Sequence, residues 1–294
     1  MPRPVLYYTD QYEIPLPSGH KFPQGKYRML RELLSLDGVF EFRPAPLADA
    51  ETISLAHDRG YVRGFLEGTL EKSAMRRTGF SWSAQLIDRT LASAGGTLAA
   101  TRIALETGWG GTLAGGTHHA FRDHGSGFCV FNDIAIAIRR LGVRAAVLDL
   151  DVHQGDGTAA IFEKDESVFT VSLHGRNNFP FRKQLGRIDI ELDDNTGDAE
   201  YLERLETVFP HVRNHRPEIV FYQSGVDGLL EDRLGRLALT HQGLEQRDRR
   251  VLGFCLGERI PVVITLGGGY ASPIELSVEA HAATFRMAAR LFAR

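Results

Sequence analysis

Histidine and aspartate side chains follow several short apolar runs of this 294-residue chain, and their types and spacing suit metal chemistry. Asp151 and His153 lie two residues apart on what should still be extended chain, so both side chains point to the same face and can reach one cation. Asp227 follows another apolar run and completes a set of two carboxylates and one imidazole with an open fourth position. Such a set is typical of catalytic zinc sites that activate water. The alternative is a polar turn whose carboxylate only caps the next helix.

The adjacent histidines His118 and His119 would by default be packing residues, but the metal motif offers them partners. Asp149 and Asp156 flank that motif, and each is free to hold one imidazole, which fixes the tautomer of the ring and raises its basicity. The sequence therefore predicts two His–Asp pairs beside a metal-activated water, and such pairs can transfer protons during hydrolysis.

The run Gly267–Tyr270 (GGGY) is rich in glycine, yet it lacks the Gly-x-Gly-x-x-Gly spacing and the downstream acid of a dinucleotide-binding loop. We interpret it as a loop that permits close backbone approach and presents the Tyr270 hydroxyl as a hydrogen-bond donor to an oxyanion.

The residues with this chemistry come after apolar runs without polar alternation, which are typical of buried parallel strands. Segments with helix-type spacing separate the runs, so the sequence indicates an α/β fold. Ligands of open parallel sheets bind beyond the carboxyl ends of the strands, so we expect these polar residues to meet at one edge. The expected strands are Gly111–Ala114, Ala145–Leu150, Val168–Leu173, Ile219–Gln223 and Pro261–Leu266, and the expected helices include Ala84–Glu106, Asp133–Leu141, Ala199–Val212 and Thr240–Leu256.

The final helix has the clearest start signal. Ser272-Pro273-Ile274-Glu275 fits a capping box with proline at the first helical position, and spaced apolar residues follow as far as Met287. The N-terminal part is expected to mix strands and helices, with loops at Pro15–Gly25 and Pro44–Ala50. Because the chain contains no internal repeat and no Pro/Ser-rich linker, residues 1–294 are expected to form one domain.

Composition excludes several classes of protein. The net charge is −3 and the basic residues are dispersed, so DNA or RNA is not expected as a direct partner. Cys129 and Cys255 are far apart in apolar surroundings, which favours two buried thiols in a reducing compartment over a disulfide. The N-terminus lacks the regions of a signal peptide and no apolar run could span a bilayer, so we expect a cytoplasmic protein without a membrane partner.

Five motifs, in this order along the chain, resemble the histone deacetylase and acetylpolyamine amidohydrolase superfamily. The resemblance extends from about Pro15 to the C-terminus, and the segments His118–Phe121 and Gly175–Lys183 are most similar to bacterial members of the class IV type. It implies an arginase/deacetylase-like fold, in which three α/β/α layers surround a central, mostly parallel sheet. The motifs are Gly115–Asn132, Asp149–Gly157, Ser172–His174, Ser224–Gly235 and Leu266–Tyr270.

The resemblance implies a deacylase with one zinc ion, bound by Asp151, His153 and Asp227. It implies that His119, paired with Asp156, is the general base and then the general acid. By the same resemblance, His118, paired with Asp149, orients the water and stabilises charge. Tyr270 would polarise the acyl carbonyl and stabilise the oxyanion.

The resemblance also implies a structural monovalent cation, usually potassium. Its ligands here would be Asp149, the Ser172 hydroxyl, and the backbone oxygens of Leu173, Asp151 and His153. Gly127, Phe128 and Phe179 would line a narrow apolar tunnel for the amine chain of the substrate, and ordinary core packing is the alternative for these three residues.

Other functions remain possible on the sequence alone. An arginase-like ureohydrolase would need further carboxylates to bridge two manganese ions, but Asp227 is followed by Gly228-Leu229. A silent acyl-lysine binding module would not need the complete set of His119, Tyr270 and three ligands. The substrate could be an acylated lysine of a protein or an acylated small amine such as an acetylpolyamine. A two-Asp, one-His site also accepts iron(II) or cobalt(II). The segments Ser18–Lys21 and His57–Gly64 are expected to shape the rim.

Overall fold

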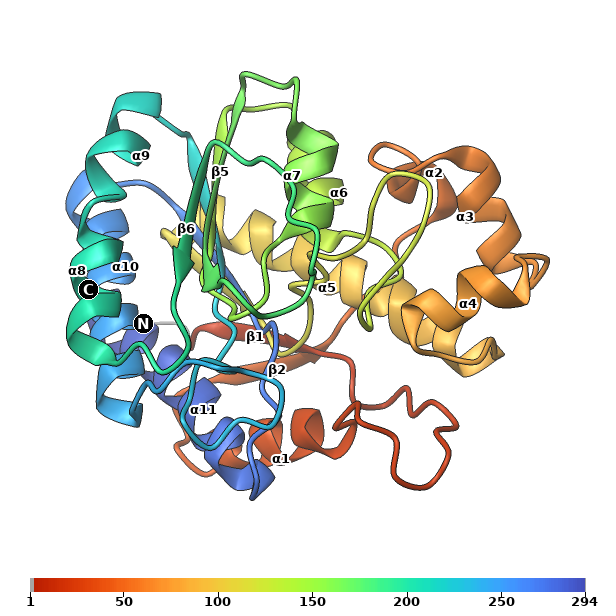
Figure 1. Ribbon diagram of the computed structural model, residues 1–294, viewed down its shortest axis with the longest axis horizontal. Coiled ribbons are helices and arrows are strands. Elements are labelled where there is room, and N and C mark those ends of the chain that lie inside the picture. The colour runs from red at the N-terminus through yellow and green to blue at the C-terminus, as the bar shows by residue number, and fades with distance from the viewer. Residues whose placement is uncertain (1–2, 294) are drawn as a thin grey trace.

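The computed structural model describes residues 3–293 and contains one eight-stranded sheet (Figure 1). The strand order is β2-β1-β3-β8-β7-β4-β5-β6 and every pairing is parallel, which confirms the expected α/β architecture. The strands are β1 (Val5–Tyr8), β2 (Glu41–Pro44), β3 (Trp109–Thr112), β4 (Ala145–Asp149), β5 (Val168–Gly175), β6 (Ile188–Leu192), β7 (Ile219–Gln223) and β8 (Val262–Thr265).

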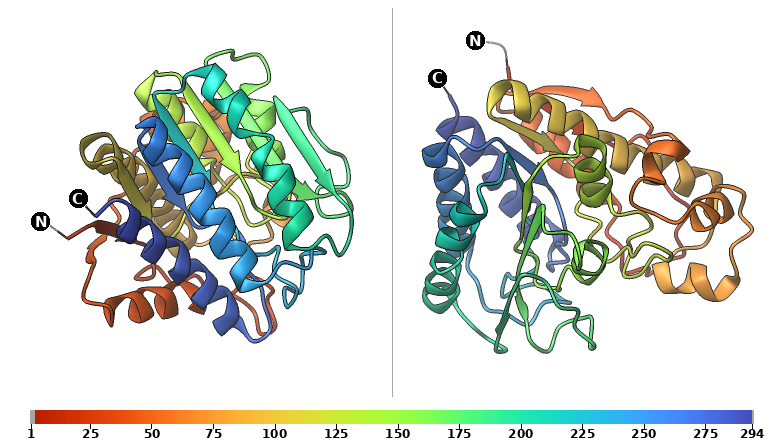
Figure 2. Two further views of the ribbon diagram at one scale, coloured as in Figure 1. Left: turned by 90° about the vertical axis from the view of Figure 1, so that its left-hand side faces the viewer. Right: turned by 90° about the horizontal axis from the view of Figure 1, so that it is seen from above.

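Helices cover both faces of the sheet, as the two views of Figure 2 show. One layer holds α1 (Gly25–Ser35), α8 (Asp198–Glu206), α9 (Phe209–His215), α10 (His241–Glu258) and α11 (Ile274–Leu291). The other holds α5 (Ala84–Thr107), α6 (Asp133–Leu141) and α7 (Asp156–Phe162), with the short helices α2 (Ala50–Ile53), α3 (Arg59–Leu66) and α4 (Lys72–Thr78) beyond α5. Buried apolar side chains form one core on each face, because the central strands are buried on both sides.

The sheet brings the functional motifs together. The strands β3, β8, β7, β4 and β5 are consecutive neighbours, so the residues after their carboxyl ends lie along one edge. Asp149, the last residue of β4, pairs in register with Gln223 of β7 and Ser172 of β5. Within residues 3–293, no helix is both long and apolar enough to cross a membrane.

The single helix predicted over Ala199–Val212 is wrong, because the structure has two helices there. α8 ends at Glu206, and α9 begins at Phe209 with Pro210 in its first turn. Inside a continuous helix, Pro210 would remove one backbone hydrogen bond and clash with the preceding turn, whereas the first turn of a new helix tolerates it. The apolar spacing continues across this break and therefore hides it.

The start of the last helix also differs from the prediction. Pro273 is the N-cap of α11 rather than its first helical residue, and no side chain caps the helix. The backbone N–H of Ser272 donates instead to the Glu231 oxygen, and the Ser277 hydroxyl accepts from Ala271 N–H. Both bonds tie this segment to neighbouring groups, so Ser272 does not act as a cap.

Candidate active site

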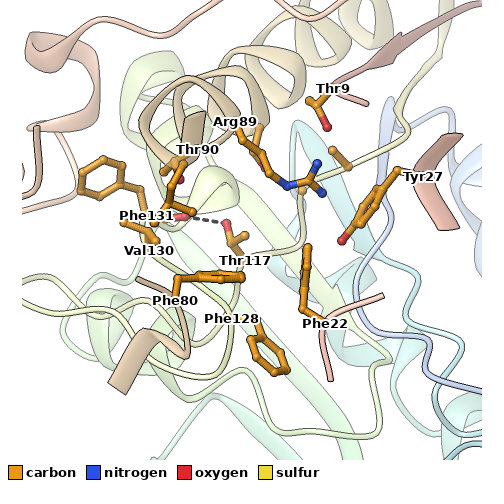
Figure 3. A pocket seen from close by; sticks show the side chains of 14 residues that line it. Thr9, Phe22, Tyr27, Phe80, Arg89, Thr90, Thr117, Phe128, Val130 and Phe131 are labelled. Atoms are coloured by element: carbon orange, nitrogen blue, oxygen red, sulfur yellow. Dashed lines mark hydrogen bonds between the residues drawn. The ribbon is translucent and has the colours of Figure 1, made fainter. Parts of the chain in front are cut away.

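A pocket of about 610 Å³ opens at the carboxyl ends of the central strands. It is lined by His118, His119, Asp151, His153 and Tyr270, while the predicted partners of these residues lie behind them. A smaller cavity, drawn in Figure 3, adjoins this pocket. The structure thus brings together the predicted site residues from five strand ends.

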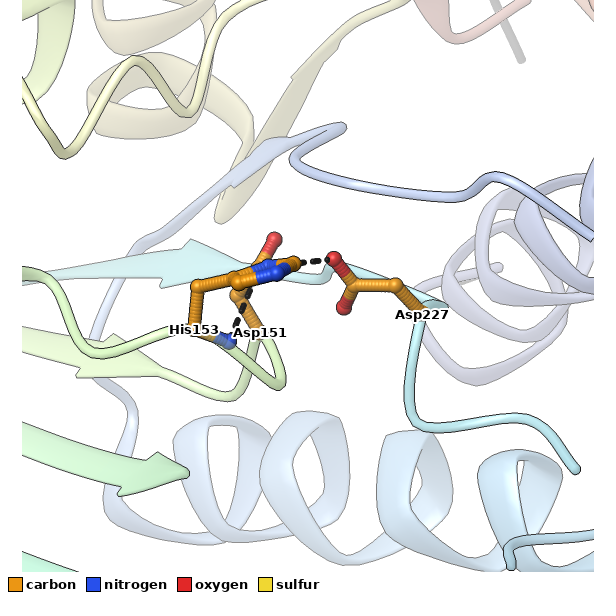
Figure 4. A group of neighbouring side chains, drawn as sticks. All are labelled: Asp151, His153 and Asp227. Carbon is orange, nitrogen blue, oxygen red and sulfur yellow. Dashed lines mark hydrogen bonds and ion pairs between the residues drawn. The ribbon is translucent and has the colours of Figure 1, made fainter. Parts of the chain in front are cut away.

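Asp151, His153 and Asp227 form a compact cluster at the floor of the pocket (Figure 4). Each offers one ligand atom, and these atoms lie within 4.8 Å of one another. His153 Nδ1 is 3.0 Å from Asp151 Oδ1 and 3.0 Å from Asp227 Oδ2. Around a tetrahedral zinc with ligands at about 2.0–2.2 Å, the ligand atoms lie roughly 3.3–3.6 Å apart, so the cluster has the dimensions of one such site.

Backbone and side-chain donors orient these carboxylates. Asp151 Oδ2 accepts from Gly268 N–H at 2.7 Å and from the Gln223 amide at 3.2 Å. Asp227 Oδ1 accepts from Val152 N–H at 2.9 Å. Each contact joins two different strand ends. Gln223 carries no recognisable motif, and its one signal in the sequence is that a polar residue closes an apolar strand run.

The charges of the cluster fit a bound cation. Asp151 and Asp227 are fully buried, and no Lys or Arg among residues 3–293 forms an ion pair with either. Burial, followed by the charge of Asp151, raises the pKa of Asp227 to about 7. Two adjacent buried carboxylates are costly unless a positive charge compensates them. A divalent metal supplies that charge, so the residues present fit zinc.

The two adjacent histidines each hold a buried aspartate. His118 Nδ1 is 2.7 Å from Asp149 Oδ2, and His119 Nδ1 is 2.6 Å from Asp156 Oδ1. Gly155, between the metal motif and Asp156, is required for this packing, because an added Cβ would lie 2.1 Å from Asp149 Oδ2. With Nδ1 engaged, the Nε2 atom of each ring is left for the pocket.

The two imidazoles differ in protonation although their ring centres are 4.0 Å apart. Burial lowers the pKa of His118, but the charges of Asp149 and Asp151 outweigh it and raise the pKa to about 9. Burial lowers the pKa of His119 to about 4, and the charge of His118 adds to this shift, while the hydrogen bond that His119 donates to Asp156 opposes it. The two rings therefore differ in proton affinity, and His119 is the ring that more readily stays neutral and can accept a proton.

Tyr270 lies across the pocket on the glycine-rich loop. Its backbone N–H donates to Asp232 Oδ2 at 2.6 Å, and burial raises the pKa of its hydroxyl, which keeps the proton available for donation. Buried Lys26 donates to the Gly269 oxygen at 3.1 Å, and its ammonium lies 5.4 Å from the Tyr270 ring centre. Lys26 lies in none of the five motifs, and Asp232 lies within Ser224–Gly235 but was given no role there, since both residues act through tertiary packing.

The predicted tunnel residues Gly127, Phe128 and Phe179 all line the pocket. Phe179 meets His119 edge-on, with ring centres 4.9 Å apart. Gly127 has a φ of +50°, and an added Cβ would lie 2.6 Å from His119 Cδ2, so only glycine lets the wall approach the imidazole. Phe128 N–H donates to the Thr78 oxygen at 3.0 Å, which anchors the wall to the end of α4.

Only one of the two segments expected at the rim lines the pocket. Lys21, from the segment Ser18–Lys21, is among the lining residues together with the neighbouring Phe22. The segment His57–Gly64 is absent from the lining, so that expectation is wrong. His57 is buried, with Nδ1 2.9 Å from the Phe121 oxygen, and its Nε2 accepts from Asn132 N–H at 2.8 Å. It supports the loop after His119 from behind.

The residues expected to hold a monovalent cation lie beneath the histidine pairs. Asp149 and Ser172 are opposite each other in the β4–β5 register, and Leu173 is buried beside them. The Ser172 hydroxyl is 2.9 Å from His174 Nδ1. The arrangement gathers the expected residues, although it identifies no ion.

There is no second group of side chains within residues 3–293 to hold the further metal that a ureohydrolase would require. Within residues 3–293, one group of three His, Cys, Asp or Glu side chains brings its ligand atoms together. Leu229, two positions after Asp227, is buried and apolar where a bridging carboxylate would be needed. The site therefore suits one metal.

Comparisons with known proteins agree with this geometry. The histone deacetylase domain model matches residues 20–285. An uncharacterized protein of Picosynechococcus is 44% identical over 298 aligned positions, which cover 97% of this chain and 98% of that protein. A probable deacetylase of Methanothermobacter thermautotrophicus is 31% identical, with 90% of this chain and 85% of the relative covered.

Among solved structures, the acetylpolyamine aminohydrolase of Burkholderia pseudomallei superposes with a TM-score of 0.78. The superposition covers 96% of this chain and 97% of the other, at 22% sequence identity. The fold is thus the three-layer arginase/deacetylase type.

Proposed function

This chain belongs to the histone deacetylase family, and from that premise we propose that it is a zinc-dependent amidohydrolase. Its substrate would be an acylated lysine side chain or a related amine. One observation carries the proposal: the cluster of Asp151, His153 and Asp227, the two His–Asp pairs and Tyr270 converge on a single pocket. A silent acyl-lysine binding module would not need both imidazole pairs.

In this proposal, Asp151, His153 and Asp227 hold the zinc, which when bound supplies Lewis acidity and activates water for attack on the acyl carbon. His119 takes a proton from the attacking water at Nε2, while Asp156 holds its Nδ1. The Tyr270 hydroxyl donates to the carbonyl oxygen as negative charge develops there. His118, held by Asp149, orients the attacking water and stabilises charge on the same side.

The proton balance needs no further reactant. The oxygen of water bonds to the acyl carbon, the carbon–nitrogen bond breaks, and the amine leaves with the proton that His119 had taken. The products are a carboxylic acid and a free amine. Phe128 and Phe179 line the path for the amine chain of the substrate.

We further propose that residues 1–294 act as one catalytic domain, which is supported by the single sheet that takes strands from both halves of the chain. A structural potassium ion at Asp149, Ser172 and Leu173 is part of the proposal, and the β4–β5 register supports it. Cys129 and Cys255 are free and buried, which agrees with the expected reducing, cytoplasmic setting.

The charges at the pocket mouth favour acyl-lysine in a protein over acetylpolyamines. Among the described residues that line the pocket, Asp151 at the floor is the sole carboxylate. The exposed charged residues that line the mouth are Lys21, Arg233 and Arg236, all basic; Arg236 pairs with Asp194, so Lys21 and Arg233 carry the positive charge that no ion pair among residues 3–293 offsets. A polycation would be repelled there, whereas a lysine neutralised by its acyl group would not.

A substrate panel tests this proposal. It contains peptides with acetyl-, longer acyl- and trifluoroacetyl-lysine, together with acetylputrescine and acetylspermidine. Each is incubated with the protein after chelation, with and without added zinc. We expect zinc-dependent hydrolysis of acyl-lysine peptides that exceeds hydrolysis of the polyamines. A complete lack of hydrolysis with zinc bound would refute the proposed activity, and a preference for the polyamines would refute the proposed substrate class.

A further inference from the structure

The cavity that adjoins the main pocket, here called the side cavity, has a volume of about 50 Å³ (Figure 3). The side cavity and the main pocket have a common wall. The residues of this wall are Phe22, Tyr27, Gly115, Thr117 and Phe128. Thr117 directly precedes the two histidines of the site. Thr117 is part of the shared wall, so the side cavity is the space that lies next to an acyl chain extending past Thr117 from the reacting carbonyl.

Arg89 of α5 lines the side cavity and is a buried cation. Arg89 is 8% exposed to solvent, and no ion pair among residues 3–293 includes it. Figure 3 shows its side chain reaching from the helix toward Tyr27. The guanidinium carbon lies 4.3 Å from the Tyr27 ring centre and 5.3 Å from that of Phe22. Aromatic faces attract a guanidinium but do not neutralise its charge.

Three acidic side chains, Asp10, Glu13 and Glu32, line a neighbouring cavity together with Arg89, and none of them forms an ion pair with Arg89 among residues 3–293. Asp10 binds Arg31 through three contacts of 2.7, 2.9 and 3.1 Å, and Glu13 binds Arg28. Asp133, behind Thr117, accepts from the backbone N–H groups of Gly116 and Thr117 and from Thr97. Arg89 therefore keeps its positive charge available to a ligand.

The side cavity also contains an unsatisfied hydroxyl. Thr9 Oγ1 is buried and has no hydrogen-bond partner among the described residues. Thr90 and Ser93, which follow Arg89 on α5, add two more hydroxyl groups to the lining. A buried polar atom without a partner is costly, so this arrangement favours a polar ligand over an apolar one.

The volume limits the size of that ligand. At about 10–15 Å³ per water-sized probe, a cavity of about 50 Å³ holds three to five non-hydrogen atoms. A terminal methylene and carboxylate comprise four. An acetyl group would leave the space unused, and a long fatty chain would exceed it.

We propose that Arg89 and the side cavity form a subsite for the terminal carboxylate of a short dicarboxylic acyl group, such as succinyl, on the lysine substrate. The inference rests on the proposed deacylase function and names the acyl class. The reaction is the same hydrolysis: water adds to the amide carbon, the carbon–nitrogen bond breaks, and succinate and the lysine amine are released. Arg89 binds the carboxylate distant from the reacting carbon and takes no part in bond breaking.

The first test compares two peptides on the unaltered protein. One carries succinyl-lysine and the other 4-methylpentanoyl-lysine, which has nearly the same shape but ends in two methyl groups instead of a carboxylate. We expect kcat/KM to be at least about 10-fold higher for succinyl, since a hydrogen-bonded charged pair discriminates by roughly that factor. Equal values, or a preference for the neutral chain, would overturn the proposal without any variant.

The second test uses Arg89→Gln, with Arg28→Gln as the matched control. Arg28 is half exposed on α1, pairs with Glu13 and does not line the side cavity. We expect the ratio of succinyl to 4-methylpentanoyl hydrolysis to fall about 10–100-fold in Arg89→Gln and to stay unchanged in Arg28→Gln. A ratio that does not change in Arg89→Gln would contradict the assignment.

A third variant covers the case in which Arg89→Gln fails to fold. Ser93→Leu keeps the charge of Arg89 but fills the side cavity, so it should reduce succinyl hydrolysis relative to acetyl hydrolysis by about 10-fold. An unchanged succinyl-to-acetyl ratio would place the acyl group elsewhere. The acetyl-lysine peptide also separates the two hypotheses: hydrolysis of acetyl without any preference for succinyl refutes only the subsite, whereas inactivity toward every acyl-lysine refutes the deacylase itself.

Discussion

The floor of the main pocket and the side cavity next to it are built in opposite ways. On the floor, each carboxylate of the proposed metal site accepts a hydrogen bond from the backbone of another strand end, as Asp227 does from Val152. In the side cavity, aromatic rings surround an unpaired Arg89 and an unsatisfied Thr9 hydroxyl. The floor consists of Asp151, His153, Asp227, His118, His119 and Tyr270.

This difference indicates that the floor and the side cavity have different roles. A floor fixed by hydrogen bonds holds reacting groups in one geometry, so its loss should affect the rate with any substrate. A cavity lined by aromatic rings and unsatisfied polar groups can bind part of a ligand, so altering it should change the preference among substrates. Substitutions on the floor are therefore expected to lower activity strongly with every substrate. Substitutions in the walls and the side cavity should have smaller effects that depend on the substrate.

The largest effect is expected from Asp227→Ala. Removing one of three protein ligands should abolish zinc binding, and the activity loss should exceed the 10–100-fold typical of residues that only orient a ligand. Elemental analysis measures zinc per chain, with the exposed Asp193→Ala as control. Full zinc occupancy in Asp227→Ala would rule out its assignment as a ligand.

Tyr270→Phe should have the next largest effect. The substitution removes a single hydroxyl donor, so kcat should fall by about 10²–10³-fold while the zinc content stays the same. Steady-state kinetics on an acyl-lysine peptide and elemental analysis check both parts. Turnover close to that of the unaltered protein would mean that another group stabilises the oxyanion.

Asp156→Asn tests whether catalysis depends on the buried pair of His119 and Asp156, in contrast to a His–Asp pair on the surface. It should lower kcat/KM by about 10–100-fold because His119 loses the carboxylate that orients it. The surface pair of His124 and Asp123, with atoms 2.7 Å apart, provides the matched variant Asp123→Asn, which should change kcat/KM less than about twofold. Equal effects of the two variants would contradict the role of Asp156.

The smallest effect is expected at the mouth. Phe181 lines the pocket yet is 89% exposed, so Phe181→Ser should raise KM for an acyl-lysine peptide about 3–10-fold with little change in kcat. Leu185 is 84% exposed in the same segment but lies outside the pocket lining. Leu185→Ser should leave KM unchanged. A change in kcat for Phe181→Ser would instead place this wall in the chemical step.

The same contrast explains what the sequence could predict. Asp151, His153 and Asp227 were identifiable because parallel strands end at one edge and polar residues follow those strands. The partners Asp149 and Asp156 followed from their position beside the metal motif. Local sequence was enough here because strand direction and backbone hydrogen bonds determine these positions.

The walls could not be predicted in the same way. Phe22 and Tyr27 reach the pocket only because β1 joins the sheet between β2 and β3, and α1 packs against α11. Lys26 and Arg89 carry no motif, and their burial depends on contacts between segments distant in sequence. The break at Pro210 is hidden in the sequence because the apolar spacing continues through it. Tertiary packing decides each of these features, and one sequence does not specify that packing locally.

The most direct test of the floor is a zinc titration. The protein is stripped of metal by chelation, and hydrolysis of an acetyl-lysine peptide is measured as zinc is added back in fractions of one equivalent per chain. The structure predicts no activity without metal and a rise that saturates at one equivalent, because one three-ligand cluster lies within residues 3–293. Full activity in the metal-free protein, or saturation only at two equivalents, would contradict a single-zinc deacylase.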